Sequence, residues 1–263
     1  MSNLEPTIRV NVDPANPGQY FACCGLLELA ERAWKDVEAW FEVGSFAISG
    51  TGSLQSLLTS IVKSTLSPLD STIPTMSPLH LAEPFNLRLD WWLDERAGGS
   101  MFKTWAGQQK VVSIASAMKG ALAPNRLDEE SLFNTSAILY DADGGKIEPF
   151  YLDARRAAQS HTIDVGFSPD AQKMLMPVFS TVEFLCLVGL QRFRPVCVPD
   201  DNVFEYATWH DSLPIAVAAA AASGSVTLRS SRYRFQLLYR TKYLKGFLPA
   251  IPVNKVDGEN NYG

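Results

Sequence analysis

The residues best suited to bind a ligand gather in one C-terminal stretch. Six of the chain's 23 cationic side chains fall between residues 229 and 245, and no acid occurs from residue 229 to residue 250. These cations and the aromatic residues among them form the set Arg229, Arg232, Tyr233, Arg234, Tyr239, Arg240, Lys242, Tyr243 and Lys245. Cations that meet phosphates and rings that stack on bases are the groups that bind single-stranded nucleic acid.

The same stretch has a second interpretation as an ordinary half-buried strand with a solvated polar face. In a strand, Arg232 and Arg234 share one face while Tyr233 and Phe235 share the other, because side chains alternate. Composition alone favours neither interpretation. Both predict a strand, and only the first predicts a nucleic-acid interface.

A smaller basic site is predicted from four cations, namely Lys103, Lys110, Arg155 and Arg156. The first two frame a polar, aromatic loop in which Gly107 allows close approach of a ligand or partner to the backbone. Arg192 and Arg194 are different, since they close an apolar helical segment. The helix dipole favours cations in a last turn and accounts for them without a ligand.

Groups for catalysis are scarce. The three histidines are His80, His161 and His210, and none is paired in the sequence with a nucleophile or an acid that would activate it. Asp141 and Asp143 lie in an Asp-x-Asp-Gly-Gly turn, where turn propensity explains both acids. The motifs of nucleotide-binding, hydrolase and zinc sites are absent from the sequence. We therefore predict no catalytic residue, no metal site and no cofactor.

Length, charge and cysteine usage limit the class of protein. The chain has 263 residues, 46% of them hydrophobic, and a net charge of −5, so any nucleic-acid surface must be local. No apolar run is long enough for a membrane span, and the first residues do not resemble a signal peptide. Cys23 and Cys24 lie inside an apolar helical pattern, which is typical of reduced, buried thiols. We expect a cytoplasmic protein without a membrane partner.

The opening of the chain predicts an α+β protein. Residues 7–12 alternate as a strand, residues 19–35 repeat apolar side chains with a helical period, residues 40–49 are predicted as a second strand and residues 53–65 as a second helix. This β-α-β-α order predicts a ferredoxin-like βαββαβ core. Residues 1–65 would form the N-terminal half of one module.

The remaining chain divides into three segments. Residues 66–135 are predicted to be an insertion with irregular and helical parts, because four prolines fall between residues 66 and 84. Residues 136–253 would complete the first module or form a second one. Residues 254–263 are predicted to be a disordered tail.

A duplicated module is one interpretation of the two most apolar helical segments. Residues 178–193 resemble residues 19–35, since both contain a Gly-Leu step and one acid, Glu28 or Glu183, near an otherwise apolar face. Two buried helices can also resemble each other by chance. The sequence leaves both interpretations open.

Three segments resemble one protein family. Residues 11–29 (NVDPANPGQYFACCGLLEL) resemble the N-terminus of a subunit family of type I-U CRISPR systems, also called type I-G. Residues 102–109 (FKTWAGQQ) and 183–195 (EFLCLVGLQRFRP) are similar to the same family. The pattern at the start of the first segment recurs in several subunits of this subtype, so the resemblance indicates a small effector or accessory subunit without fixing which one.

The resemblance implies membership of the RAMP superfamily, whose ferredoxin-like, RRM-like modules bind guide RNA. It also implies partners, namely other effector subunits and the helicase-nuclease of the system. One feature departs from the family. RAMP proteins often contact RNA through a glycine-rich loop near the C-terminus, and here only Gly246 lies close to the basic stretch. No catalytic residue of the family matches a position of this chain.

Three functions follow, in order of preference. The first is a non-catalytic, RNA-binding subunit of a type I-U effector complex that acts in antiviral defence. The second is a protein adaptor that docks the helicase-nuclease or another subunit through exposed aromatic residues around Trp91-Trp92 and the proline-rich segment. The third is a metal-independent, guide-processing endoribonuclease with His161 or His210 as general base.

Overall fold

A computed structural model describes residues 4–93, 104, 108–141, 143–155, 177–198, 203–226, 228–239 and 245–253. Its helices are α1 (Pro17–Trp34), α2 (Leu54–Lys63), α3 (Val111–Gly120), α4 (Ser180–Gly189) and α5 (Ile215–Ala222). Its strands are β1 (Ile8–Asn11), β2 (Glu38–Glu42), β3 (Ser45–Ser49), β4 (Leu66–Pro68), β5 (Leu79–Leu81), β6 (Leu87–Leu89), β7 (Val196–Val198), β8 (Val203–Ala207), β9 (Leu213–Pro214), β10 (Arg232–Tyr239), β11 (Lys245–Phe247) and β12 (Ile251–Val253). The described part is thus a mixed α+β protein with three antiparallel sheets and five helices, which confirms the predicted class.

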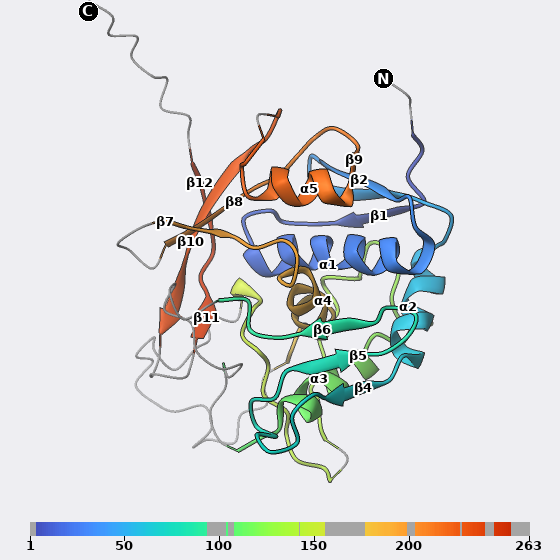
Figure 1. Cartoon of the computed structure of the whole chain (residues 1–263), viewed down its shortest axis with the longest axis vertical. Coiled ribbons are helices and arrows are strands. Elements are labelled where there is room, and N and C mark those ends of the chain that lie inside the picture. The colour runs from blue at the N-terminus through green and yellow to red at the C-terminus, as the bar shows by residue number, and fades with distance from the viewer. Residues whose placement is uncertain are drawn as a thin grey trace, which may run out of the picture.

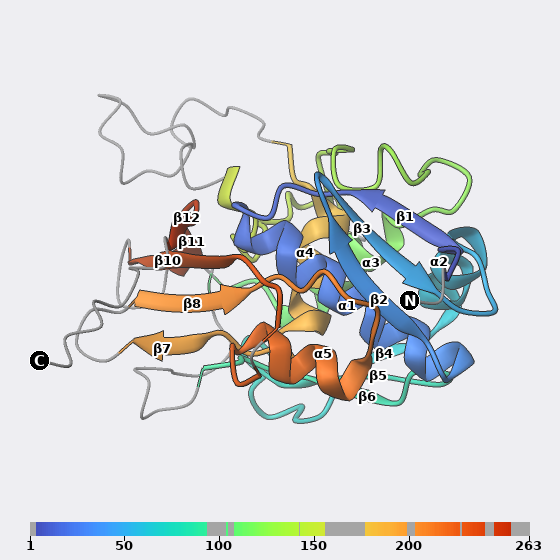
Figure 2. The same cartoon turned by 90° about the horizontal axis from the view of Figure 1, so that it is seen from above.

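The three sheets surround the central helices. The four-stranded sheet has the order β1-β3-β2-β9, and the three-stranded sheet has the order β4-β5-β6. The five-stranded sheet has the order β11-β10-β8-β7, with β12 also paired to β10. Figure 1 shows α1 lying along the four-stranded sheet, and Figure 2 shows the five-stranded sheet on the other side of α1 and α4. Among the described helices, none is both long enough and apolar enough to cross a membrane.

Residues 40–49, predicted as one strand, belong to a hairpin instead. Strands β2 and β3 pair antiparallel from Glu38↔Ser49 to Glu42↔Ser45. The turn between them contains Gly44 with a φ of 74°, a conformation that glycine adopts without a steric penalty. The prediction missed the turn because apolar residues continue on both sides of it.

The first four elements have the order of the first four elements of a ferredoxin-like module, but β4 does not join their sheet as the last strand of such a module would. The chain order β1-α1-β2-β3 and the spatial order β1-β3-β2 match the start of such a module. Strand β4, which would lie beside β1 in that fold, pairs with β5 in a separate sheet. A complete βαββαβ core is therefore not evident among the described residues.

The proline-rich segment is less irregular than predicted. Its two ends form β4 and β5, paired from Leu66↔Leu81 to Pro68↔Leu79. Strand β6 pairs with β5 and completes the small sheet. Pro74, Pro78 and Pro84 lie between the strands, whereas Pro68 is the last residue of β4. The residues of β5 and β6 alternate into the core. Residues 254–263, predicted to be disordered, lie outside the described residues.

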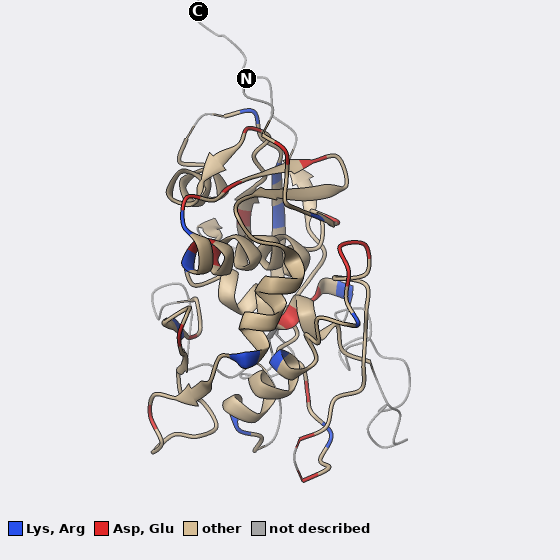
Figure 3. Cartoon of the chain, turned by 90° about the vertical axis from the view of Figure 1, so that its right-hand side faces the viewer, with Lys and Arg blue, Asp and Glu red and all other residues tan. Residues whose placement is uncertain are grey.

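One hydrophobic cluster connects all three predicted segments. It includes Leu27 from the first, Ile114 from the second and Leu185 from the third. Figure 3 shows that most of the central helices are free of Lys, Arg, Asp and Glu, which lie mainly at helix ends and in the outer segments. The division into modules stays a prediction. Cys23 and Cys24 are buried, free thiols in this cluster, as predicted.

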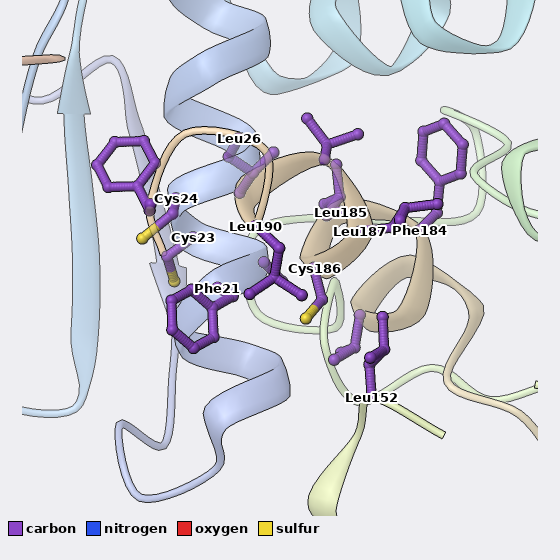
Figure 4. Close-up of a cluster of buried hydrophobic side chains, with 14 of the residues drawn as sticks. Phe21, Cys23, Cys24, Leu26, Leu152, Phe184, Leu185, Cys186, Leu187 and Leu190 are labelled. Atoms are coloured by element: carbon purple, nitrogen blue, oxygen red, sulfur yellow. The ribbon is translucent and has the colours of Figure 1, made fainter. Parts of the chain in front are cut away.

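Helices α1 and α4 cross at two glycines. A Cβ atom on Gly25 would lie 2.0 Å from the carbonyl oxygen of Leu185, and one on Gly189 would lie 2.0 Å from that of Phe21. Each glycine thus faces the residue four positions before the other glycine. Figure 4 shows the side chains of α1 and α4 interdigitating around this crossing. The shared Gly-Leu step noted in the sequence therefore marks the closest contact of the two helices.

Two buried acids fix the ends of this helix pair. Glu28 accepts a hydrogen bond from Arg32 at 2.7 Å and another from Arg192, which follows the end of α4. Glu183 accepts the backbone N–H groups of Leu152 and Asp153, both at 3.1 Å. Buried charges are stable only with such partners. Arg192 therefore has a structural partner that the helix dipole did not predict.

Candidate nucleic-acid interface

Strand β10 presents its basic and aromatic residues on opposite faces, as predicted. It lies inside the five-stranded sheet, with β8 on one side and β11 and β12 on the other. Arg232 and Arg234 are exposed, and Phe235 is buried against the core. The alternation of a strand produces this division. The outer face of the sheet is therefore the face that carries the cations.

The two described aromatic side chains of β10, Tyr233 and Phe235, pack inward and offer no base-stacking platform on the outer face. The Tyr233 ring stacks on the Tyr206 ring with centroids 5.6 Å apart and an interplanar angle of 15°. The Phe235 ring lies 5.0 Å from the Phe247 ring. Burial raises the pKa of the Tyr206 and Tyr233 hydroxyls. Tyr233 thus faces away from Arg232 and Arg234, so base stacking by this residue beside the cations is not expected.

The three described arginines differ in how firmly they are held. Arg234 donates from Nε to Glu205 at 2.8 Å and from a second guanidinium nitrogen to the same carboxylate oxygen. Arg232 approaches Glu205 only to 4.0 Å, and Arg229 approaches Asp211 only to 3.8 Å. Their side chains are 52% and 72% exposed respectively. Arg229 and Arg232 are therefore the cations most available to a phosphate.

The remaining predicted residues of this stretch cannot be placed. Arg240, Lys242 and Tyr243 lie outside the described residues, and for Tyr239 and Lys245 only the backbone is described. That backbone still has a clear position, because Tyr239 and Lys245 are direct partners where β10 meets β11. The basic stretch thus runs along one strand and returns on the next.

Of the smaller basic site, the structure describes Arg155 and Lys110, and Arg155 is held by partners within the chain. Arg155 donates to Asp153 at 2.6 Å and to the carbonyl oxygen of Phe133 at 2.7 Å. Its guanidinium also lies 3.4 Å from the centroid of the Phe179 ring, in a cation–π contact. Lys110 is exposed at the residue before α3. Arg156 and Lys103 lie outside the described residues.

The described histidines and turn acids have local hydrogen-bond partners. His80 Nε2 lies 2.9 Å from the side-chain oxygen of Asn86, and His210 Nδ1 lies 3.0 Å from the carbonyl oxygen of Phe41. Asp141 accepts the backbone N–H of Asp143 at 3.0 Å, as expected of a turn residue. His161 lies outside the described residues. Within the described ranges, no three His, Cys, Asp or Glu residues come together as a metal site.

The aromatic pair expected to dock a partner is buried. Trp91 and Trp92 are 8% and 4% exposed, so the prediction of an exposed aromatic surface there is wrong. The Trp92 ring packs edge-on against the ring of Phe204 at 5.1 Å, beneath the five-stranded sheet. Two adjacent tryptophans near a glycine-rich segment resemble a surface motif in sequence. Only the tertiary structure shows that the core covers them.

The sequence also missed the acid at the centre of the outer face. Glu205 lies directly opposite Arg234 in the β8–β10 register and accepts hydrogen bonds from it. The two residues are 29 positions apart, so no local pattern joins them. The one available signal was composition, because Glu205 is the charged residue of the otherwise apolar strand Val203–Ala207.

No model of a known protein family matches the chain, and no curated protein matches it significantly.

Proposed function

We propose that the chain is a non-catalytic subunit of a type I-U (I-G) CRISPR effector complex that contacts single-stranded nucleic acid, above all guide RNA. The three segments that resemble the subunit family support the choice of complex. The observation that supports the contact is the exposed, loosely paired state of Arg232, on the outer face of the sheet, and of Arg229, in the segment before β10. Guanidinium groups in this state can bind phosphate without first breaking a strong ion pair.

The geometry favours contact with phosphates over contact with bases. Tyr233 and Phe235 pack inward, whereas Arg229 and Arg232 point to solvent. Binding through phosphate alone is salt-dependent and carries little sequence preference. The proposed subunit therefore holds the RNA backbone and leaves the bases free to pair.

The fold supports a related proposal about origin. We propose that α1 with β2-β3 and α4 with β7-β8 derive from one duplicated, ferredoxin-like RAMP module. The equivalent placement of Gly25 and Gly189 at the helix crossing supports it. In each unit a hairpin follows the helix, and a third strand pairs with the second strand of that hairpin.

A second candidate function is a protein adaptor within the same complex. The observation that favours it is a pair of exposed aliphatic residues, Val196 and Ile251, on the outer face of the sheet. Apolar side chains next to arginine are common at the centres of protein interfaces. This surface replaces the buried tryptophans as the candidate site for docking the helicase-nuclease or another subunit.

RNA binding tests the first proposal directly. Fluorescence anisotropy with a labelled single-stranded RNA of guide length compares the wild type with the double variant R229A/R232A. Loss of two phosphate contacts should weaken binding about tenfold or more near physiological salt and lower the salt slope by about 1.4. R88A removes an equally exposed arginine from β6 and serves as the matched control, with binding unchanged.

The outcomes separate the two functions. Equal affinity of R229A/R232A and the wild type would overturn the RNA contact proposed here. Co-purification of another subunit that survives nuclease treatment, and that is lost in I251E, would favour the adaptor.

A further inference from the structure

A row of four side chains crosses the outer face of the five-stranded sheet. Direct register partners place Ile251 of β12, Arg234 of β10, Glu205 of β8 and Val196 of β7 side by side. Directly opposed residues in antiparallel strands project to the same face. Ile251 is 64% exposed and Val196 is 43% exposed, so both ends of the row are open to solvent. The row therefore consists of an apolar residue, a cation, an anion and a second apolar residue.

When the row is placed against a reversed copy of itself, apolar residues oppose apolar residues and the cation opposes the anion. A second copy turned by a two-fold axis parallel to the strands, between Arg234 and Glu205, would place Ile251 opposite Val196 and Arg234 opposite Glu205. A two-fold axis across the strands would instead oppose Arg234 to Arg234 and Glu205 to Glu205, which like charges disfavour. In a symmetric dimer the same patch on both copies must complement itself. We infer that this outer face is the contact surface for a second copy of this chain.

The shape of the outer face is consistent with this two-fold arrangement. A hollow of about 250 Å³ lies beside Arg234 and is lined mostly by apolar residues, among them Leu248, Pro249 and Ile251. The two-fold axis that pairs Arg234 with Glu205 brings Val196 of the second copy to the side of the face that holds this hollow. An exposed valine and an apolar hollow are complementary in shape as well as in polarity.

The charge balance favours a second copy over nucleic acid at this position. Glu205 holds Arg234 with two hydrogen bonds, so this part of the row offers a phosphate little net positive charge. Neither Arg229 nor Arg232 belongs to the row: Arg229 precedes β10, and Arg232 lies beside the row, 4.0 Å from Glu205. The inference therefore does not depend on the proposed RNA contact, and each can fail without the other.

The size of the face predicts a weak dimer. Four strands about 4.8 Å apart make a surface roughly 19 Å wide. Stable dimers bury about 800 Å² per partner, which is more than this sheet alone presents. Association should appear as a concentration-dependent equilibrium at micromolar or higher concentration, not as a permanent dimer.

Charge-reversal variants test whether two copies of the chain contact each other through this face. R234E makes the two central positions both acidic, and E205R makes both basic, so each variant repels itself. Sedimentation equilibrium of nuclease-treated protein should show the apparent dissociation constant raised at least tenfold in each variant alone. An equimolar mixture of the two variants should associate again. Within each chain the ion pair stays broken, so only contact between chains explains this recovery.

Matched variants on the other sheet supply the control. Arg9 and Glu42 form a somewhat more exposed ion pair on the four-stranded sheet. R9E, E42R and their mixture should associate like the wild type. If a charge reversal on β8 or β10 disturbs folding, I251E at the rim of the row tests the same surface and should also weaken association.

Four results would overturn the inference. They are a wild type that stays monomeric at every concentration reached, single variants that associate like the wild type, a mixture that does not recover, and association that nuclease abolishes. The last result would mean that RNA bridges the copies.

Discussion

Helix α1 with its four-stranded sheet and helix α4 with its five-stranded sheet follow one plan, and they differ in the strand that completes each sheet. Each helix is followed by a hairpin, β2-β3 or β7-β8, and a third strand pairs with the second strand of that hairpin. The third strand of the first unit is β1, which precedes its helix. The third strand of the second unit is β10, which comes near the end of the chain. Both completing strands place an arginine on the outer face, Arg9 or Arg234, so the two outer faces differ in the hairpin residues beside it.

The outer face of the first unit is closed by its own hydrogen bonds. Its equivalent row consists of Arg9, Ala47 and Trp40 in direct register. Ala47 is buried at the centre of the row. Arg9 and Trp40 both donate to the same carboxylate, that of Glu42, at 3.2 and 2.9 Å. These two polar groups are therefore already satisfied within the sheet.

The outer face of the second unit has an acid at its centre and apolar ends. Glu205 occupies the position of Ala47, and Val196 occupies that of Trp40. Its polar groups pair along the row while its aliphatic ends stay exposed. A face of this kind gains from a partner, whereas the face of the first unit does not. The comparison thus explains why we assign binding to the second sheet.

The largest effect is expected at the crossing that both units share. Gly25→Ala and Gly189→Ala each place a methyl group within about 2.0 Å of a backbone oxygen of the facing helix. Backbone cannot move aside as a flexible side chain can, so the helices must separate. We expect each variant to lose about 3 kcal/mol or more of the free energy of unfolding. Urea denaturation measures this loss.

Gly120→Ala is the matched control, because no atom lies within 4 Å of the added methyl group at the end of α3. Its stability should stay equal or rise by up to about 1 kcal/mol, since alanine favours the helix. Similar losses at Gly25 and Gly189 would show that both helices depend equally on the crossing. A wild-type stability at either position would show that they do not.

A smaller loss of stability is expected at the ion pair between Arg192, after α4, and Glu28 of α1. Arg192→Ala removes one of the two arginines that hold the buried carboxylate of Glu28. Arg192 is partly exposed, so solvent screens the loss, and we expect destabilisation of about 1–2 kcal/mol. Arg88→Ala breaks an exposed pair with Asp90 and should cost no more than about 0.5 kcal/mol. Equal effects in thermal denaturation would show that Glu28 does not connect the units.

Local periodicity explains what the sequence could predict. The apolar repeat in α1 and the alternation in β10 involve neighbours along the chain, so the helix and the two faces of the strand were visible in the sequence. The contacts of Glu205 and Glu28 were not visible, because each joins residues in different elements. The prediction that Trp92 is exposed failed for the same reason, since Phe204 covers it from a distant strand.

A third effect concerns the contact between α3, which packs on α4, and α2 of the first unit. Lys119 donates to the carbonyl oxygens of Ile61 and Val62, and burial lowers its pKa. The unfolded state then binds more protons at alkaline pH, so stability rises with pH as Lys119 loses its proton. Relative to K119M, the wild type should gain stability as pH rises towards the ordinary lysine pKa of about 10.4. Urea denaturation from pH 7 upward checks this.

Lys63→Met provides the control for this pH dependence. Lys63 is an exposed residue at the end of α2. The difference in free energy of unfolding between K63M and the wild type should stay constant as pH rises, whereas the difference for K119M should change. A stability difference for K119M that stays constant, or that moves in the opposite direction, would show that the buried ammonium does not link α3 to α2.

The smallest effect is expected from the two surface ion pairs, which provide the most selective comparison. Double-mutant cycles for Arg9 with Glu42 and for Arg234 with Glu205 should each give a coupling below about 1 kcal/mol in dilute protein, because each arginine is about half exposed and solvent screens the pair. At high concentration the second coupling should increase, since a dimer would add contacts between chains to those within a chain. The first should stay constant, because Arg9 and Trp40 already share Glu42. A concentration dependence that is equal in both cycles would remove the distinction between the two outer faces.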